Sequence, residues 1–375
     1  LLGYSSPGQM GLPAMALALV APLDSDTQAP IIIGGLFVNH LLAKASLFWL
    51  AGVVDRSNIR DWSAISRNRG LLMLLGIMMV ALVGLPPFPG FWAKWELVML
   101  LASNEMFGWI ALVLVGSLLE AAYLFRWFSY AQQPDESTTE ADNVAVGFWQ
   151  QLPIAITALL LLACGFAMAV IMQAFTPELF LPLVAGFALW LIDRVHGRLK
   201  DLPMLVAVGV GGYLLTNELE GINRLFSYLL IGGGLLVSIA AMYRNDDRRG
   251  FYPLLAVLLL SLASLLRAQT TLEFFFAWEL MTLSSYLLVT LGRGGLQNGP
   301  LSGVKPALSY LLFSLGSAYF ILTGFALAYG ASGNLLLSSL GNSGDSTAVV
   351  FSLLAIGFLI KMGGFGFHIW LPGAY

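Results

Sequence analysis

Long apolar segments alternate with short polar connections along almost the whole chain. A membrane-spanning helix needs about 20 mostly apolar residues, so the pattern predicts about twelve spans. The alternating signature of a transmembrane β-barrel is not seen, which predicts an all-α, polytopic helix bundle with broken helices. The apolar segments fall near residues 9–21, 30–53, 71–102, 107–127, 152–174, 179–193, 202–216, 223–243, 252–267, 272–291, 304–330 and 348–371.

Proline interrupts the third of these segments. The stretch Gly84-Leu85-Pro86-Pro87-Phe88-Pro89-Gly90 has three prolines within four residues, and proline cannot continue a helix. We expect two half-helices that meet within the membrane, with their freed carbonyls facing protein or water. Breaks of this kind mark ion sites in transporters. A milder break is expected at residues 363–366, directly after Lys361.

Composition supports the membrane class and excludes several others. Hydrophobic residues make up 58% of the chain and charged residues 10%, which a soluble domain of 375 residues would not tolerate. Cys164 is the single cysteine, so disulfides and cysteine metal sites are excluded. The sequence also has no phosphate-binding loop, no nucleophile elbow, no histidine cluster with metal-ligand spacing and no basic nucleic-acid patch. We therefore expect no cofactor, no metal and no nucleic-acid partner.

Basic residues gather in the loops of one side of the predicted bundle. The loops near 103–107, 175–178, 217–222 and 331–347 hold no Lys or Arg, so the positive-inside rule places the basic side in the cytoplasm. We expect the chain in the plasma (inner) membrane. The loop 133–143 is acidic, but acidic residues weigh little in this rule. The basic side holds Arg56, Arg60, Arg67, Arg69, Arg194, Arg198, Lys200, Arg244, Arg248, Arg249, Arg293 and Lys305.

Three lysines lie deep inside apolar segments: Lys44, Lys94 and Lys361. A charged lysine in hydrocarbon is unfavourable by several kcal/mol unless it is paired or hydrated, so these residues suggest a route for charge through the membrane. Lys94 follows the proline-rich break by four residues. It is either a proton carrier or a side chain that snorkels to the interface.

His40 and Lys44 are four residues apart and therefore share a helix face. Two neighbouring titratable groups can exchange a proton directly or through one water. The alternative is a polar face that bonds a neighbouring helix, because polar groups also hold membrane helices together.

Glu279 lies about seven residues inside its apolar segment, and Lys361, in a later segment, is its natural partner. The pair is either functional or a structural ion pair, although buried pairs seldom add net stability. His368 follows Lys361 by seven residues. It either passes a proton onward or bonds a carbonyl that the glycine-rich break frees.

Two further carboxylates are second-tier candidates. Glu120 lies in the middle of its segment, and an offset of six residues does not pair it well with Arg126. Glu96 follows Lys94 by two residues. His196, in a basic loop, is expected to be solvated.

These residues resemble the antiporter-like membrane subunits of respiratory complex I, a family shared with Mrp-type cation/proton antiporters and membrane-bound hydrogenases. Residues 244–375 resemble the first half of such a subunit, through Phe275-Phe276-Ala277-Trp278-Glu279-Leu280-Met281-Thr282-Leu283, Phe358-Leu359-Ile360-Lys361 and His368-Ile369-Trp370-Leu371-Pro372. Residues 1–130 resemble the second half, through Tyr4 to Gly11, His40 to Phe48 and Gly84 to Lys94. The residues between, 145–243, match only in hydropathy.

The order of the halves is unexpected, because second-half motifs precede first-half motifs. We expect two domains: residues 1–175, the C-terminal half of one module, and residues 176–375, the N-terminal half of a second. A tandem fusion explains this order, as does a chain assembled from separate pieces. The family's eighth helix, with its lysine, is missing from both modules. The start at Leu1 and the apolar end at Tyr375 suggest an excerpt of a longer polypeptide.

The resemblance implies a proton-translocating membrane subunit without its own redox centre, in a complex related to NADH:quinone oxidoreductase or membrane-bound hydrogenase. Its expected partners are other antiporter-like subunits, quinone- or hydrogenase-type subunits, the lipid bilayer and transported protons. Glu279 would modulate Lys361, and protons would pass through His40 and Lys44 to Lys94, so that Lys94 and Lys361 never share a channel. The alternatives are a sodium/proton antiporter module without redox coupling and a structural membrane subunit without transport. Its status as an enzyme subunit stays open.

Overall fold

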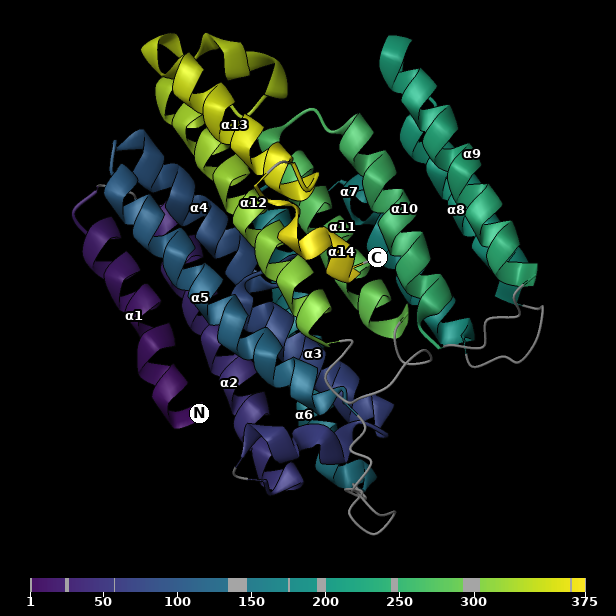
Figure 1. Ribbon diagram of the computed structural model, residues 1–375. Coiled ribbons are helices and arrows are strands. Elements are labelled where there is room, and N and C mark those ends of the chain that lie inside the picture. Colours follow the sequence, from purple (N-terminus) through teal and green to yellow (C-terminus); the bar gives the residue numbers. More distant parts are fainter. Residues whose placement is uncertain are drawn as a thin grey trace. The chain divides into compact units, whose positions relative to one another are not determined.

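The computed structural model describes residues 2–23, 27–56, 58–133, 147–174, 176–193, 200–243, 249–292, 304–364 and 366–374. This part of the chain is helical (Figure 1). One isolated β-bridge joins Thr270 to Leu336. Seven of the described helices are long and apolar enough to cross a membrane, and five shorter apolar helices accompany them. The predicted all-α, polytopic class is therefore confirmed.

The chain divides into two compact units. Unit 1 comprises Leu1–Ala174 with Gln297–Leu308, and unit 2 comprises Phe175–Leu296 with Ser309–Tyr375. The first division lies one residue from the boundary proposed from the sequence, whereas the return of residues 297–308 to unit 1 was not foreseen. The assignment of each part to one half of a module stays a prediction.

Unit 1 holds the helices of the first half of the chain. They are α1 (Leu2–Val20), the π-helix η1 (Pro30–Gly34), α2 (Gly35–Val54), the 3-10 helix η2 (Ile59–Ile65), α3 (Arg69–Val83), α4 (Pro89–Ser103), α5 (Phe107–Ala131) and α6 (Phe148–Ile171). The predicted segment 71–102 is thus two helices, which are separated by residues 84–88.

Helix α2 packs against α3, α4 and α6, and its Leu47 is fully buried. Polar contacts join it to its neighbours as well. Asn39 Nδ2 donates to the Ala81 carbonyl of α3 over 2.8 Å, and the hydroxyls of Ser46 and Thr157 share a hydrogen bond between α2 and α6. Because lipid is as apolar as leucine, packing and such polar contacts hold membrane helices together.

The connection from α2 to α3 packs against α5 through η2. Its helix η2 carries Trp62, whose ring meets the Trp127 ring of α5 edge to face with centroids 4.6 Å apart. The Trp62 indole also donates to the Arg56 carbonyl over 3.3 Å. The polar segment between the two helices is therefore held by a buried aromatic pair.

Unit 2 holds most of the remaining helices. They are α7 (Pro177–Ile192), α8 (Asp201–Thr216), α9 (Gly221–Tyr243), α10 (Phe251–Arg267), α11 (Thr271–Gly292), α12 (Val304–Ser332, which enters unit 2 at Ser309), α13 (Thr347–Lys361) and α14 (Leu371–Ala374), with the 3-10 helices η5 (Leu337–Asn342), η6 (Gly344–Ser346) and η7 (His368–Trp370).

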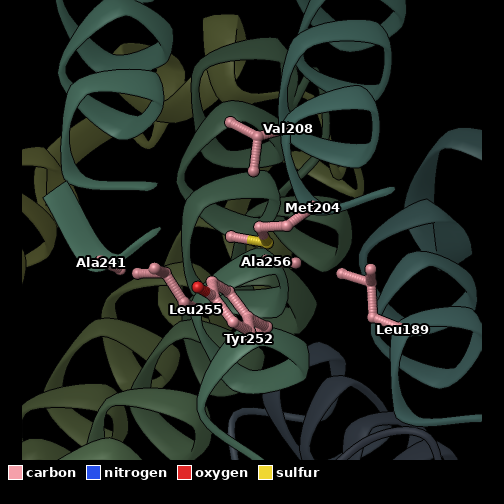
Figure 2. Packing of buried hydrophobic residues seen from close by; sticks show 7 residues of the cluster. All are labelled: Leu189, Met204, Val208, Ala241, Tyr252, Leu255 and Ala256. Atoms are coloured by element: carbon pink, nitrogen blue, oxygen red, sulfur yellow. The ribbon is translucent and has the colours of Figure 1, made fainter. Parts of the chain in front are cut away.

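Helix α10 is central among the first helices of unit 2, because it contacts α7, α8, α9 and α11. Its inward side chains pack into one buried cluster with residues of α7, α8 and α9 (Figure 2). The cluster consists of Leu189, Met204, Val208, Ala241, Tyr252, Leu255 and Ala256.

A buried polar network closes this cluster at the start of α10. The Tyr252 hydroxyl donates to Asp201 Oδ1 over 2.8 Å, and Lys200 Nζ lies over the Tyr252 ring and 3.9 Å from Asp193 Oδ1. Asp193 Oδ2 accepts from the Gly250 amide over 2.6 Å. Each buried charge thus has a partner, as burial of charge requires.

Helices α12 and α13 pack closely. The Ser317 hydroxyl of α12 donates to the Gly357 carbonyl of α13 over 2.8 Å. A Cβ at Gly357 would lie 2.6 Å from Ile321 Cγ1, so only glycine allows this approach. The result places the last turn of α13, which carries Lys361, against α12.

Several predictions about loops concern residues that lie outside the described part of the chain. They are residues 134–143 of the acidic loop, His196 and the basic residues Arg194, Arg198, Arg244, Arg248 and Arg293. The predicted orientation of the basic side therefore stays a prediction.

Candidate functional site

Lys94, on α4, points its ammonium group into unit 1. Its side chain is 13% exposed, and Nζ donates to the Val83 carbonyl over 2.7 Å and to Ser117 Oγ over 3.0 Å. Nζ also lies 3.8 Å from Glu120 Oε2. Acceptors from α3 and α5 therefore hold the ammonium group inside the bundle, which favours the internal arrangement over snorkelling.

The helix break creates this position. Helix α3 ends at Val83, and Gly84 follows with φ of +77°, a conformation that glycine adopts without strain. A Cβ at Gly84 would lie 2.9 Å from Lys94 Cδ, so a glycine also leaves space for the lysine. The last carbonyls of a helix lack partners within it, and a cation there interacts favourably with the helix dipole. Lys94 thus satisfies the end of the preceding half-helix.

Other carbonyls at the break face protein as well. Ala81 accepts from Asn39, and the Pro87 carbonyl accepts from the Trp92 indole over 3.3 Å. The sequence-based expectation of carbonyls that face protein therefore agrees with these contacts.

Glu120 lies between two lysines of unit 1. Besides its ion pair with Lys94, its charge acts on Lys44, which is 5% exposed on α2. Lys44 in turn acts electrostatically on His40, one turn earlier on the same helix. His40, Lys44, Glu120 and Lys94 therefore form an electrostatically connected row. From the sequence, Glu120 was only a second-tier candidate, because Arg126 was the only partner considered for it.

Glu96 is not part of this row. It is partly buried, and its Oε2 accepts from Gln28 Nε2 over 3.4 Å, just before η1. Because Glu96 follows Lys94 by two residues, the two side chains leave α4 in different directions.

Lys361 closes α13 in unit 2 and lies among hydroxyl groups. Its Nζ donates to Thr282 Oγ1 over 2.9 Å, to Ser314 Oγ over 3.0 Å and to the Tyr310 hydroxyl over 3.1 Å. The ammonium group also lies 4.9 Å from the Tyr310 ring centroid and 5.7 Å from that of Trp278. Its three donors therefore each have a neutral acceptor, and two aromatic rings add cation–π attraction.

Glu279, on α11, is 1% exposed, and neither of its carboxylate oxygens has a hydrogen-bond partner among the described residues. Lys361 therefore lies beyond hydrogen-bond distance of this carboxylate, although its charge acts on it. The sequence predicted the partnership, whereas the structure shows an electrostatic relationship without a direct bond.

The chain turns sharply after Lys361. Gly363 and Gly366 both have positive φ, and the Trp370 indole donates to the freed Ile360 carbonyl over 3.2 Å. Trp370 thus takes one carbonyl at the break, a role considered for His368. The His368 side chain is exposed.

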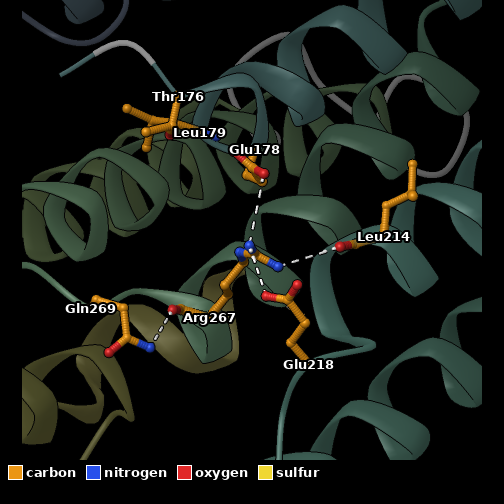
Figure 3. Close-up of polar contacts among 7 residues, drawn as sticks. All are labelled: Thr176, Glu178, Leu179, Leu214, Glu218, Arg267 and Gln269. Atoms are coloured by element: carbon orange, nitrogen blue, oxygen red, sulfur yellow. Dashed lines mark hydrogen bonds and ion pairs between the residues drawn. The ribbon is translucent and has the colours of Figure 1, made fainter. Parts of the chain in front are cut away.

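A separate polar cluster surrounds Arg267 at the end of α10 (Figure 3). Arg267 Nη2 lies 3.3 Å from Glu218 Oε2 and 3.7 Å from Glu178 Oε1, and Nη1 donates to the Leu214 carbonyl over 3.5 Å. A cavity of about 170 Å³ lies beside it, between the starts of α7 and α11 and the ends of α8 and α10. Partly exposed ion pairs of this kind stabilise a protein by at most about 1 kcal/mol. We therefore interpret the cluster as a structural contact that joins the ends of neighbouring helices.

The sequence did not predict the hydroxyl partners of the two lysines. Ser117 lies three residues before Glu120, and Thr282 lies three residues after Glu279. A hydroxyl and a carboxylate with this spacing share a helix face, so the spacing was the available signal. The partner helix is not visible from spacing alone.

Together, the fold and these sites define a polytopic helical membrane protein that holds ionisable side chains at helix breaks inside the bundle. The family described as NADH:quinone oxidoreductase/Mrp antiporter, TM, matches residues 1–120 and 268–375. The chain therefore belongs to this family. The matched residues include His40, Lys44, Lys94, Glu96, Glu120, Glu279, Lys361 and His368.

Several curated proteins are similar to the chain. NADH-quinone oxidoreductase subunit N 2 of Syntrophobacter fumaroxidans is 32% identical over 184 residues, which cover 46% of this chain and 38% of that protein. Subunit N 1 of Sorangium cellulosum is 26% identical over 258 residues, covering 59% and 48%. Subunit 14 of Thermus thermophilus is 32% identical over 156 residues, covering 42% and 34%. The matches thus span less than half of each of these relatives, and no solved structure matches.

Proposed function

We propose that the chain is a proton-translocating membrane subunit of a complex that oxidises NADH and reduces quinone, and that it has no redox centre of its own. Membership of the family and the names of the similar subunits support the reaction class. The observation that carries the proposal is that each unit holds a partly buried lysine at a helix break within electrostatic range of a carboxylate, Glu120 in unit 1 and the buried Glu279 in unit 2.

In unit 1, the proton path follows the row of titratable groups on α2, α5 and α4. His40 and Lys44 lie one turn apart, and Glu120 connects Lys44 to Lys94 electrostatically. Lys94 delivers the proton toward the side opposite the basic loops. Glu96, on the other face of α4, is a second-tier group for release.

In unit 2, the central group is Lys361, and Glu279 modulates it from α11. When the two groups approach, the carboxylate stabilises the ammonium form, and when they separate the lysine releases its proton more readily. His368, beyond the break, receives the proton. Opening and closing of this pair is therefore the proposed switch.

Protons are the proposed ion in place of Na⁺. A lysine carries a proton on its own nitrogen, but an ammonium group has no lone pair with which to bind Na⁺. Within the described residues, Glu279, Glu120 and Glu96 each stand in a different setting, and no group of three or more His, Cys, Asp or Glu side chains is placed to hold a metal ion.

The proposed setting is a multi-subunit complex in the inner membrane, with the basic loops in the cytoplasm. Antiporter-like and quinone-binding subunits are the proposed neighbours. The two halves are proposed to belong to two modules joined in tandem; the family matches one stretch in each half, residues 1–120 and 268–375. Peptides that cross residues 130–270, detected by mass spectrometry of the native protein, would establish the junction.

Proton uptake by inverted membrane vesicles tests the proposal. NADH is added as the electron donor, and a pH-sensitive dye reports the gradient in Na⁺-free buffer. The variant Lys361→Ala is expected to lose proton uptake while the complex still assembles. Wild-type proton uptake in Lys361→Ala would contradict the proposal. The matched control is Arg69→Ala, an exposed basic residue at the start of α3, which should pump normally.

A further inference from the structure

The two partly buried lysines at the helix breaks, Lys94 and Lys361, have different partners. Lys94 pairs with the Glu120 carboxylate, whereas the bonded acceptors of Lys361 are the hydroxyls of three residues on two other helices. We call Thr282, Tyr310 and Ser314 the hydroxyl cage. A buried ammonium group normally requires a carboxylate, so a cage of neutral acceptors calls for an explanation.

The cage adjoins the carboxylate that it replaces. Glu279 and Thr282 are three residues apart on α11 and share one face of that helix. Thr282 bonds Lys361, whereas Glu279, one turn away, keeps both oxygens without a hydrogen-bond partner in the described part of the chain. A lysine has four rotatable side-chain bonds, so a change of rotamer can carry Nζ across the one helical turn that separates Thr282 from Glu279.

The opposite wall of the cage belongs to α12. Tyr310 and Ser314 are four residues apart, which places both hydroxyls on one helix face toward Lys361. Ser317, three residues further, bonds the Gly357 carbonyl of α13 and so keeps the two helices together. The cage is therefore a built site on packed helices and does not depend on a loop.

We propose that the hydroxyl cage is a resting position for the Lys361 ammonium group, which alternates between the cage and Glu279, and that Thr282, Tyr310 and Ser314 act as positioning residues. The inference rests on the proposed function. In the cage, three neutral acceptors and two aromatic rings stabilise the cation less than the Glu279 carboxylate does, so the lysine releases its proton more readily there than beside Glu279. Departure toward Glu279 exchanges these neutral partners for a carboxylate.

The titratable groups that face this lysine come from several elements. Glu279 on α11 acts on it electrostatically and Tyr310 on α12 accepts its hydrogen bond, while Tyr286 lies two turns after Glu279 on α11 and His368 follows the break beyond α13. Substitutions that keep all of these groups therefore isolate the contribution of the cage. Thr282→Val and Ser314→Ala meet this condition, because neither removes a titratable side chain.

The test compares cage variants with matched controls in the intact complex. Thr290→Val and Ser284→Ala are the controls, since among the described residues both hydroxyls bond only carbonyls of their own helix α11. We measure proton uptake per NADH oxidised across a range of pH, with Thr282→Ser as the conservative variant. Ser314→Ala alone serves where Thr282→Val reduces the amount of complex, and Tyr310→Phe, which removes a titratable group along with its oxygen, is a further variant.

The cage variants remove hydrogen-bond acceptors that stabilise the ammonium form of Lys361. Thr282→Val combined with Ser314→Ala should lower proton uptake per NADH at least fivefold and move the alkaline limb of the pH profile to lower pH. Thr282→Ser should restore uptake to the wild-type level, and the two controls should match wild type.

Unchanged uptake and an unchanged pH profile in Thr282→Val, Ser314→Ala and Tyr310→Phe would overturn the cage, while loss of uptake in Lys361→Ala would keep the proposed function. Normal uptake in Lys361→Ala would instead overturn both. The two failures are therefore distinguishable.

Discussion

Lys94 donates a hydrogen bond to the carbonyl of Val83, the residue at which the preceding half-helix ends, over 2.7 Å. The break and the lysine therefore depend on each other. The end of α3 gains a cation for its unpaired carbonyls, and Lys94 gains an acceptor that takes no part in proton transfer. A membrane lysine is in this way held by backbone as well as by Ser117 and Glu120.

The glycine at the break should be sensitive to substitution. Gly84→Ala places a Cβ at positive φ, which costs about 1–2 kcal/mol, and the Cβ would also press on Lys94. We expect a lower melting temperature of the purified complex and reduced proton uptake. Gly116→Ala is the control, because nothing lies within 4 Å of its Cβ. Equal behaviour of the two variants would contradict this role of the break.

Glu120 should contribute strongly to proton uptake, although the sequence made it only a second-tier candidate. Glu120→Gln keeps the shape of the side chain but removes the charge that acts on both Lys44 and Lys94. Loss of one charge-assisted interaction of about 1.5–3 kcal/mol corresponds to a drop of about tenfold or more in proton uptake. Glu105→Gln, at an exposed position after α4, should pump normally. Wild-type uptake in Glu120→Gln would remove this carboxylate from the path.

Ser117 should position Lys94. Ser117→Ala removes one of the acceptors of the ammonium group, and we expect a change in the pH dependence of uptake together with a moderate fall in its rate. Ser129→Ala is the control on the same helix, because its hydroxyl bonds the Arg126 carbonyl of α5. Identical pH profiles for wild type and Ser117→Ala would show that the serine is dispensable.

The cluster around Arg267 should contribute little to proton uptake. Arg267→Gln removes two partly exposed ion pairs, each of which contributes about 0–1 kcal/mol and is screened by salt. We expect a small, salt-dependent loss of thermal stability and proton uptake close to wild type. Abolished uptake in this variant would mean that the cluster belongs to the ion path.

The fold class followed from the sequence because hydropathy and segment length alone identify spanning helices. The break at residues 84–88 was equally accessible, since proline removes donors wherever it stands. The pairing of Glu120 with Lys94 was not, because it joins α5 to α4, and spacing along one helix reveals only contacts within that helix. Helix packing decides such contacts.

Unit 2 illustrates the same limit. The sequence placed Glu279 and Lys361 in one site but implied a direct pair, whereas Lys361 bonds Thr282, Tyr310 and Ser314. Serine and threonine are common in membrane helices as packing residues, so their presence carried no signal. The indole of Trp370, which was not singled out from the sequence, takes the Ile360 carbonyl, and both roles considered for His368 stay predictions.

The most direct measurement of the central claim is proton uptake by inverted vesicles that contain the double variant Lys94→Ala and Lys361→Ala, with assembly of the complex and NADH oxidation followed in parallel. The account predicts an assembled complex that pumps no protons through this subunit, while Arg69→Ala pumps normally. Wild-type uptake per NADH in the double variant would contradict it and would leave the buried lysines with a structural role only.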